Sequence, residues 1–307
     1  MPAEPAFPAP DPRDVDPRVV RRAFGRAAAT YDGAAVLQRE VGARMASRLD
    51  YVKVTPATVL DVGCGTGEAV GELSVRYPQA RVVAVDAALP MVVAARERAR
   101  RGRSLLRKLL PAPFTGARDP WFVCADVNAL PLPGVAFDVV WSNLLLQWVN
   151  DLPRAFGELR RVLKVGGLLT FTTFGPDTLH EVRRAFARAD GHTHTNRFVD
   201  MHDLGDMLVA AGFADPVMDM EKITLTYADA GALMRELKQL GATNATRGRP
   251  HGLTGRRRWQ RMLAALEAMR RDGRIPATFE VVYGHAWKGT PSRTADGTPI
   301  VRFAPPR

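Results

Sequence analysis

The chain has 307 residues, 46% of them apolar, and a formal net charge of +11. That length and apolar content allow one large α/β domain, or two small ones, with a real core. The two cysteines, Cys64 and Cys124, are too few for a disulfide framework or a cysteine metal site, and no run of eighteen apolar residues predicts a membrane-spanning helix.

The positive charge indicates an acidic partner, such as a protein, a nucleic acid or an anionic membrane surface, or simply arginines in solvent. The low cysteine content fits a reducing cytoplasm. Residues 1–17 carry prolines and acids without a basic start and an apolar run, so we expect a disordered arm and not a signal peptide.

Strand-like and helix-like segments alternate after the arm. A helical stretch is expected from about Pro17 to Asp50, followed by strands in "ATVLDVG", "ARVVAVD", "WFVCAD", "FDVVWSN" and "GLLTFTTF" with helical segments among them. This alternation predicts right-handed βαβ units and a parallel sheet buried on both faces. Residues 101–120 interrupt the pattern with basic residues and prolines, and we interpret them as a surface insertion.

The rhythm changes after Phe174. Helices are expected at 177–190, 203–211, 229–240 and 258–272, and "EKITLTY" and "TFEVVYGHAWK" could close the sheet as an antiparallel pair. We therefore predict a single domain over 18–289, in which 176–275 form a helical region for substrate or partner. Residues 290–307 are expected to be a disordered tail.

The stretch "VLDVGCGTG" predicts a tight turn that holds a ligand at the end of the first strand. A dinucleotide fingerprint needs glycine or alanine at Glu68, and a phosphate loop needs a Lys-Ser/Thr pair that this stretch lacks. The acids around the turn would repel a pyrophosphate but suit a zwitterion with a cationic centre, such as S-adenosylmethionine (SAM). The residues predicted to form this part of the site are Asp61, Gly63, Cys64, Gly65 and Gly67, with Cys64 as a small buried apolar residue and not a nucleophile.

Two further acids follow successive strands. Asp86 ends the second strand, where a carboxylate can accept both ribose hydroxyls, and Asp126 ends the third, where it can accept from the adenine amino group. Met91 and Val127 would pack on the adenine ring, and Ala87 lies beside Asp86. Each acid alone could be a helix cap, but three at successive strand ends favour a ligand.

Four stretches, "VLDVGCGTG", "VVAVDAALPMV", "CADVNALPLP" and "FDVVWSNLLLQW", resemble the motifs of class I SAM-dependent methyltransferases. The resemblance implies a Rossmann-like, seven-stranded, mostly parallel sheet with an antiparallel last strand. It also implies a SAM contact from Asn143.

A narrower resemblance extends over 20–288. "AFGRAAATYD", "SNLLLQWVNDL", "FTTFGPDTLHEV", "HTNRFVDMHDL" and "LKQLGATNATRGR" are similar to the malonyl-[acyl-carrier protein] O-methyltransferases of biotin synthesis. That family esterifies the free carboxylate of a malonyl thioester on the way to a pimeloyl chain, so the resemblance implies SAM as co-substrate and an acidic acyl carrier protein as partner. A carboxylate is already ionised at neutral pH, and we expect no catalytic general base.

Three side chains are predicted to position this substrate. Tyr31 would donate to the malonyl group from a lid over the SAM site, although a Tyr that only packs the N-terminal helix is the alternative. Arg197 would clamp the carboxylate in a bidentate manner, against the alternative of a surface ion pair. Trp148 would pack near the pocket.

A basic segment, "RGRPHGLTGRRRWQRM", would meet the acidic carrier. Trp259, Met262, Leu263 and Leu266 would form the buried stripe of the following helix, and a merely solvated basic face remains the alternative. The residues predicted to contact the partner are Arg256, Arg257, Arg258 and Arg261. His192, His194 and His202 lack the spacing of a zinc site, so no metal is expected.

Three other functions stay open at this point. "GPDTLHEVR" and "PATFEVVYGHAW" resemble a respiratory complex I assembly factor that hydroxylates an arginine, which would make this an enzyme acting on a protein side chain. A nucleic-acid methyltransferase fits the charge, but the basic segments are not interleaved with aromatic residues. A SAM-binding module without turnover is the third possibility.

Overall fold

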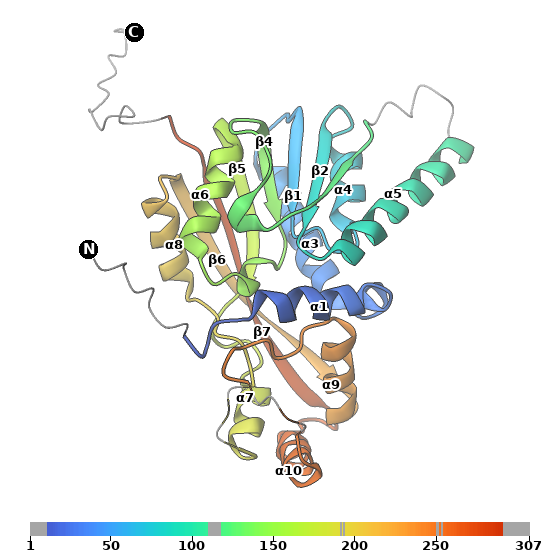
Figure 1. The fold of residues 1–307 in the computed structure, drawn as a ribbon, viewed down its shortest axis with the longest axis vertical. Coiled ribbons are helices and arrows are strands. Elements are labelled where there is room, and N and C mark those ends of the chain that lie inside the picture. Colours follow the sequence, from blue (N-terminus) through green and yellow to red (C-terminus); the bar gives the residue numbers. More distant parts are fainter. Residues whose placement is uncertain are drawn as a thin grey trace, which may run out of the picture.

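The computed structural model describes residues 11–109, 118–190, 192, 194–249, 252 and 254–290. A seven-stranded sheet lies at its centre in the order β3-β2-β1-β4-β5-β7-β6 (Figure 1). Strands β1 to β5 are parallel, and β7 pairs antiparallel with both β5 and β6. The expected sheet is therefore confirmed. Its strands are β1 Thr58–Val62, β2 Arg81–Asp86, β3 Trp121–Cys124, β4 Phe137–Ser142, β5 Leu163–Phe174, β6 Ala214–Tyr227 and β7 Ile275–Trp287.

Apolar runs in the central strands bury both faces of the sheet. Val59, Leu60 and Val62 of β1 are at most 1% exposed, as a parallel strand between two helical layers requires. The core on one face includes residues of α3 (Val36–Arg48), α4 (Glu68–Arg76) and α5 (Leu89–Leu109). The other face packs on α6 (Leu152–Val162) and α8 (Met201–Ala210).

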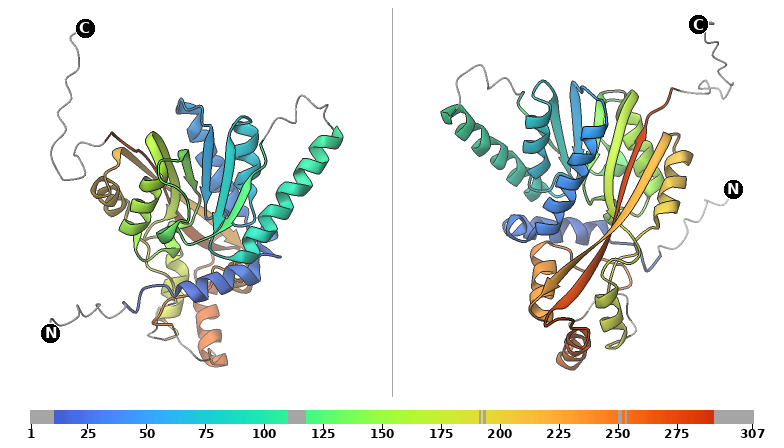
Figure 2. Two further views of the ribbon diagram at one scale, coloured as in Figure 1. Left: turned by 45° about the horizontal axis from the view of Figure 1, so that its top comes forward. Right: turned by 180° about the vertical axis from the view of Figure 1, so that it is seen from behind.

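The long antiparallel strands carry a second group of helices beyond the parallel sheet. Strands β6 and β7 extend past their neighbours, and α7 (His180–Ala187), α9 (Ala230–Gln239) and α10 (Arg256–Glu267) gather around their far ends (Figure 1, Figure 2). The predicted region 176–275 thus contains the four expected helices, but the 14-residue strand β6 also runs through it.

The N-terminal segment crosses the carboxyl ends of the parallel strands. The helical stretch predicted over 17–50 divides into α1 (Pro17–Ala27), α2 (Tyr31–Ala34), α3 and a 3-10 turn, η1 (Leu49–Tyr51). In Figure 1, α1 lies across the lower end of the sheet, where the glycine turn leaves β1. The start of the chain is therefore placed to cover a ligand at that edge.

Two boundaries expected from the sequence were wrong. The predicted disordered arm includes residues 11–16, but Val15 is buried and bridges to Thr246, and the amide of Asp16 donates to Ala245 O across 2.7 Å. The insertion was expected to begin at residue 101, but helix α5 continues through that position to Leu109 and projects from the body (Figure 2). Residues 1–10, 110–117 and 291–307, which include parts of the predicted arm, insertion and tail, lie outside the described residues.

Candidate functional site

The glycine turn after β1 has a backbone that only glycine adopts easily. Gly63, Gly65 and Gly67 have φ angles of 78°, 51° and 82°, all in the left-handed region. Space is also limiting, because a Cβ added at Gly63 would lie 2.8 Å from the Leu145 side chain, and one at Gly67 would lie 2.8 Å from Ala95 Cβ. The predicted turn therefore exists, and its shape requires these glycines.

The amides of the turn are occupied within the protein. Gly63 and Cys64 both donate to Val85 O, at 2.8 and 3.0 Å, and Gly67 donates to Cys64 O at 2.8 Å. These three amides are therefore not free to bind a ligand carboxylate in this structure. Cys64 is buried, and burial raises the pKa of its thiol well above the ordinary value, which fits the predicted packing role.

Two acids meet beside the turn. Asp86 accepts from Gly65 N through Oδ2 at 3.0 Å and from Ala88 N through Oδ1 at 2.8 Å. Asp61 is 1% exposed, and its Oδ2 has no hydrogen-bond partner among the described residues. Burial, with the charge of Asp86 adding to it, raises the pKa of Asp61 to about 8. A buried carboxyl oxygen without a partner is a place for a hydrogen-bond donor or a cation from a ligand.

A cavity of about 230 Å³ extends from Asp86 along the ends of β1, β2 and β3 and is lined by Gly63 of the turn; Asp61 lies buried two residues before Gly63 and does not line the cavity. Asp126 lines it and caps the 3-10 turn η3 (Val127–Ala129) by accepting from Asn128 N at 2.9 Å. Ala87 and Val127 line it as well, whereas Met91 lines a smaller cavity of about 80 Å³ that adjoins it. The three predicted acids thus lie at one edge of the sheet. Asp126 both caps η3 and faces the cavity.

The segment of α1 and α2 covers the smaller cavity. The ring of Phe24 packs edge-on against Trp148, with centroids 5.1 Å apart, and lies 6.4 Å from the ring of Tyr31. Burial, with the charges of Asp86 and Glu68 adding to it, raises the pKa of Tyr31. The phenol therefore stays protonated at neutral pH and can donate a hydrogen bond.

Asn143 lines the same small cavity but is held by the protein. Its Nδ2 donates to Gln38 O at 3.0 Å, and its Oδ1 accepts from Thr172 Oγ1 at 2.7 Å. These bonds tie the end of β4 to α3 and β5. Asn143 is therefore rigidly placed at the cavity wall.

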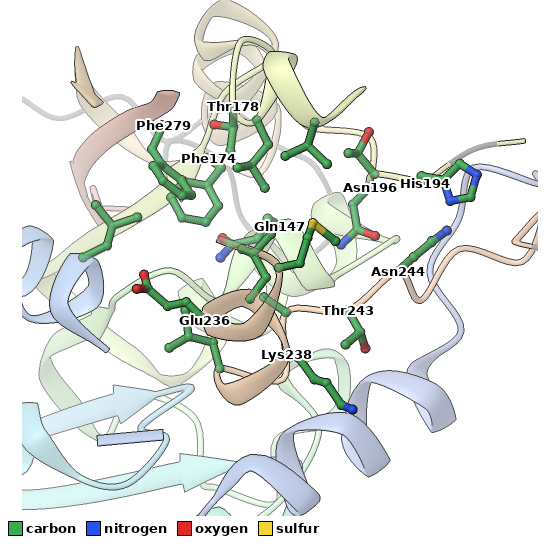
Figure 3. Close-up of a pocket in the computed structure, with 18 of the residues that line it drawn as sticks. Gln147, Phe174, Thr178, His194, Asn196, Glu236, Lys238, Thr243, Asn244 and Phe279 are labelled. Carbon is green, nitrogen blue, oxygen red and sulfur yellow. The ribbon is translucent and has the colours of Figure 1, made fainter. Parts of the chain in front are cut away.

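A second large cavity, of about 310 Å³, lies among α7, α9 and the ends of β5 and β7 (Figure 3). Its wall is mostly apolar and includes Phe174 and Phe279. Trp148, in the 3-10 turn η4 (Leu146–Trp148), lines this cavity and both cavities at the glycine turn. Trp148 is thus a wall residue common to all three cavities, which agrees with its predicted position near the pocket.

Several polar residues of the second cavity were not foreseen from the sequence. They come from distant segments. Gln147, Asn196 and Lys238 do lie in the quoted stretches "SNLLLQWVNDL", "HTNRFVDMHDL" and "LKQLGATNATRGR", but no spacing in the sequence marks them as facing one cavity. Figure 3 shows Gln147, Asn196 and Glu236 placed around one space. The missed polar residues include Gln38, Gln147, Asn196, Glu236 and Lys238.

Arg197 is not brought to this site. It is exposed and is not among the residues that line the three cavities, whereas its neighbour Asn196 is buried and lines the second one. The hydrogen bonds of Arg13, with the charge of Arg197 adding to them, lower the pKa of Asp11 to about 2. In this ligand-free structure Arg197 therefore lies outside the three cavities, and its part in holding the carboxylate stays a prediction.

Comparisons with known proteins agree on the class of this molecule. Residues 60–171 match a general methyltransferase domain family. The malonyl-[acyl-carrier protein] O-methyltransferase of Gallionella capsiferriformans is 53% identical over 94% of this chain and 96% of its own, and that of Laribacter hongkongensis is 54% identical over 93% and 95%. The chain belongs to the malonyl-[acyl-carrier protein] O-methyltransferase family.

Solved structures show the same fold at lower identity. The YcgJ protein of Bacillus subtilis superimposes with a TM-score of 0.56 at 18% identity, over 80% of this chain and 98% of its own. A methyltransferase-like protein of Bacillus halodurans gives a TM-score of 0.55 at 18% identity, over 80% and 99%. The class I methyltransferase fold expected for the malonyl-[acyl-carrier protein] O-methyltransferase family is thereby confirmed.

Helix α10 presents a basic face in this member of the family. Met262 and Leu266 are fully buried and Trp259 is partly buried, as the predicted stripe requires. Trp259 also lines the second cavity, so the basic face adjoins it. The exposed residues of this face are Arg256, Arg257, Arg258 and Arg261.

The histidines predicted to have no metal role have protein partners instead. The His194 ring stacks on Phe186 with centroids 3.8 Å apart, and its Nε2 lies 2.7 Å from Asp190 Oδ1. His202 pairs with Asp200. In the part of the chain that the structure describes, no group of three metal-ligating side chains is found, and no helix is both long and apolar enough to cross a membrane.

Proposed function

We propose that this protein transfers the methyl group of SAM to the free carboxylate of a malonyl thioester on an acyl carrier protein. The observation that carries the proposal is that Trp148 lines both the cavities at the glycine turn and the mostly apolar second cavity. The turn also follows a strand whose buried Asp61 has an unpartnered oxygen among the described residues. The relatives at 53–54% identity are named for this reaction.

The residues at the glycine turn fit SAM. The unpartnered Oδ2 of Asp61 would accept from the ligand's ammonium group, which is the cation its buried position calls for. Asp86 would accept from the ribose, and Asp126 from the adenine amino group, with Val127 and Met91 against the ring. SAM supplies an activated methyl group when bound.

The protein's own contribution is to align the acceptor and to exclude water. A malonyl carboxylate is ionised at neutral pH, so no residue has to remove a proton before attack. The phenol of Tyr31 would hold one carboxylate oxygen by a neutral hydrogen bond and leave the other free to attack in line. Phe24 and Trp148 would close the space around the reacting atoms. Alignment of this kind can contribute about 7–11 kcal/mol.

The four exposed arginines of α10 would receive the acidic carrier. They lie beside Trp259, and hence beside the cavity that would take the acyl group. Opposite charges speed the encounter and make it sensitive to salt. The neutral methyl ester would serve the route to biotin that the family resemblance implies.

The test is methyl transfer from labelled SAM to malonyl carrier protein, with acetyl and succinyl carrier proteins as controls. Label on the malonyl carrier alone, in a base-labile ester, is the expected result. Transfer to none of the carriers, with SAM still bound, would reject the proposal and favour a binding module. A gain of one oxygen on a protein arginine, measured separately by mass spectrometry, would favour the assembly-factor function, because hydroxylation transfers no methyl label.

A further inference from the structure

The second cavity continues the SAM site away from the reacting atoms. It shares Trp148 with both cavities at the glycine turn. The rest of its wall comes from α3, α7, α9, α10, the strand ends and the loops that contain Asn196 and Thr243. Its lining is mostly apolar, with Phe174, Phe279 and Met234 among the larger side chains. An occupant that reaches the methyl group through this cavity would be an extended, largely apolar chain.

Two buried amide oxygens in this wall lack protein partners. Asn196 is 8% exposed, and its Oδ1 has no hydrogen-bond partner among the described residues; the same holds for Oε1 of Gln38. Both residues line the cavity. Gln147 differs, because its Nε2 donates to Leu144 O at 2.6 Å and its Oε1 accepts from Thr173 at 3.2 Å. Buried acceptors without partners call for N–H donors on the occupant.

One fixed positive charge lies at an edge of the same cavity. Lys238 is exposed, and among the described lining residues it is the only lysine or arginine. In Figure 3, Lys238 and Thr243 lie on the side of the cavity away from Phe174 and Phe279. The carboxylate of Glu236, also in the wall, already accepts from Tyr227 at 2.7 Å. An anionic group on the occupant would therefore be placed at the Lys238 edge.

We propose that this cavity holds the phosphopantetheine arm of the acyl donor, which rests on the proposed function. Such an arm carries two secondary amides between apolar segments, with a thioester at one end and a phosphate at the other. Its amide N–H groups would donate to Asn196 and Gln38, its phosphate would pair with Lys238, and its thioester would pass Trp148. Carrier protein and coenzyme A share this arm, so the wall recognises the arm and the basic face of α10 recognises the carrier.

The phosphate contact is tested with malonyl-phosphopantetheine and malonyl-pantetheine as small acceptors, using labelled SAM. Wild type should show a lower KM for the phosphorylated acceptor. Lys238→Met should reduce that preference about fivefold, the value of a partly exposed ion pair. The matched control is Arg235→Met, one turn earlier on α9, because Arg235 does not line the cavity and pairs with Asp229. An unchanged preference in Lys238→Met, or an equal loss in both variants, would overturn the phosphate assignment.

The amide contacts are tested by Asn196→Leu and, separately, Gln38→Leu. Each substitution should raise KM for both small acceptors to a similar extent, about fivefold, and leave the Kd for S-adenosylhomocysteine unchanged. Thermal melting identifies a variant that fails to fold, in which case the other variant decides. Unchanged KM values in a folded variant would overturn the amide assignment.

The experiments distinguish a wrong assignment of the cavity from a wrong assignment of the reaction. If wild type methylates malonyl carrier protein but the small acceptors neither react nor compete with it, the arm does not use this cavity. Malonyl-coenzyme A and malonyl carrier protein, compared in the same assay, separate recognition of the arm from recognition of the carrier. If wild type methylates no malonyl acceptor, the proposed function fails, and calorimetric binding of phosphopantetheine to the wild type and to Lys238→Met still tests the cavity.

Discussion

Thr66 of the glycine turn donates a hydrogen bond to Asp32 of α2 across 2.5 Å, and Arg98 of α5 donates to both oxygens of the same carboxylate at 3.1 Å. The cover formed by α1 and α2 is therefore attached to the turn that it covers. Since Tyr31 precedes Asp32, this contact also fixes where the phenol lies. The Thr66 hydroxyl therefore links the position of this lid, formed by α1 and α2, to the shape of the SAM site.

Thr66→Val should weaken ligand binding without changing the volume of the buried side chain. Loss of a hydrogen bond to a charged group costs about 1.5–3 kcal/mol, and the partial exposure of Asp32 places the effect near the lower value. We expect the Kd for SAM to rise about tenfold. Calorimetric titration measures it, with Ser74→Ala on α4 as control, since Ser74 Oγ donates to the helix carbonyl of Val70, away from the lid. Equal affinities for wild type and Thr66→Val would show that the lid is held by other contacts.

Asp61 should make both stability and ligand affinity depend on pH. Its pKa in the folded, ligand-free protein is raised from 3.8 to about 8, so the folded chain binds more protons than the unfolded chain between these values. Stability without ligand should therefore fall as pH rises from about 4 to about 8 and level off above that. A cationic ligand favours the ionised carboxylate, so affinity for SAM should rise over the upper part of this range, by at most about tenfold per pH unit.

Asp61→Asn is the variant that isolates this effect. It should flatten the pH dependence of the melting temperature relative to wild type and remove the rise in SAM affinity toward pH 8. Melting curves and titrations at pH 6, 7, 8 and 9 measure both. A wild type whose SAM affinity stays constant from pH 6 to 9 would contradict the role of Asp61 as the acid that meets the ammonium group.

The SAM side of the site could be predicted from sequence because its signals are local. Asp61 and Asp86 end or nearly end apolar strands, and Gly63, Gly65 and Gly67 stand at alternate positions after the first of them. Parallel strands bring their carboxyl ends to one edge, so a short run of residues fixes each element of the site.

The substrate side depends on contacts between segments far apart in the chain. Gln38 of α3, Asn196 of a loop and Lys238 of α9 meet in one cavity, and no spacing in the sequence relates them. Arg197 was chosen for its chemistry, but the neighbouring Asn196 faces the cavity. Similarly, Val15 appeared to belong to a disordered arm, yet its amide and carbonyl both bond to the side chain of Asn150, 135 residues later.

Tyr31→Phe should lower kcat more than it changes ligand binding. The phenyl ring keeps the packing against Phe24, whereas the loss of the hydroxyl removes the donor to the malonyl carboxylate, so we expect kcat to fall about tenfold or more. Because burial raises the pKa of Tyr31, wild-type activity should show no loss from phenol ionisation up to pH 9. Tyr51→Phe is the control, since Tyr51 is 90% exposed on the outer surface. An unchanged kcat in Tyr31→Phe would assign Tyr31 to packing alone.

Charge reversal on α10 should act on the carrier and not on the arm. Arg258→Glu places an acid on the exposed basic face, so KM for malonyl carrier protein should rise about fivefold at low salt relative to KM for malonyl-pantetheine, and the difference should shrink as salt is added. Arg100→Glu has the same change in net charge but lies on α5, far from α10 in Figure 1. Steady-state kinetics at about 20 and about 300 mM salt compare the two variants. Relative to 0.1 M salt, the Debye length is roughly twice as long at about 20 mM and roughly half as long at about 300 mM. If both variants raise KM for the carrier protein equally, net charge alone attracts the carrier. If neither variant raises it, the basic face of α10 is only solvated.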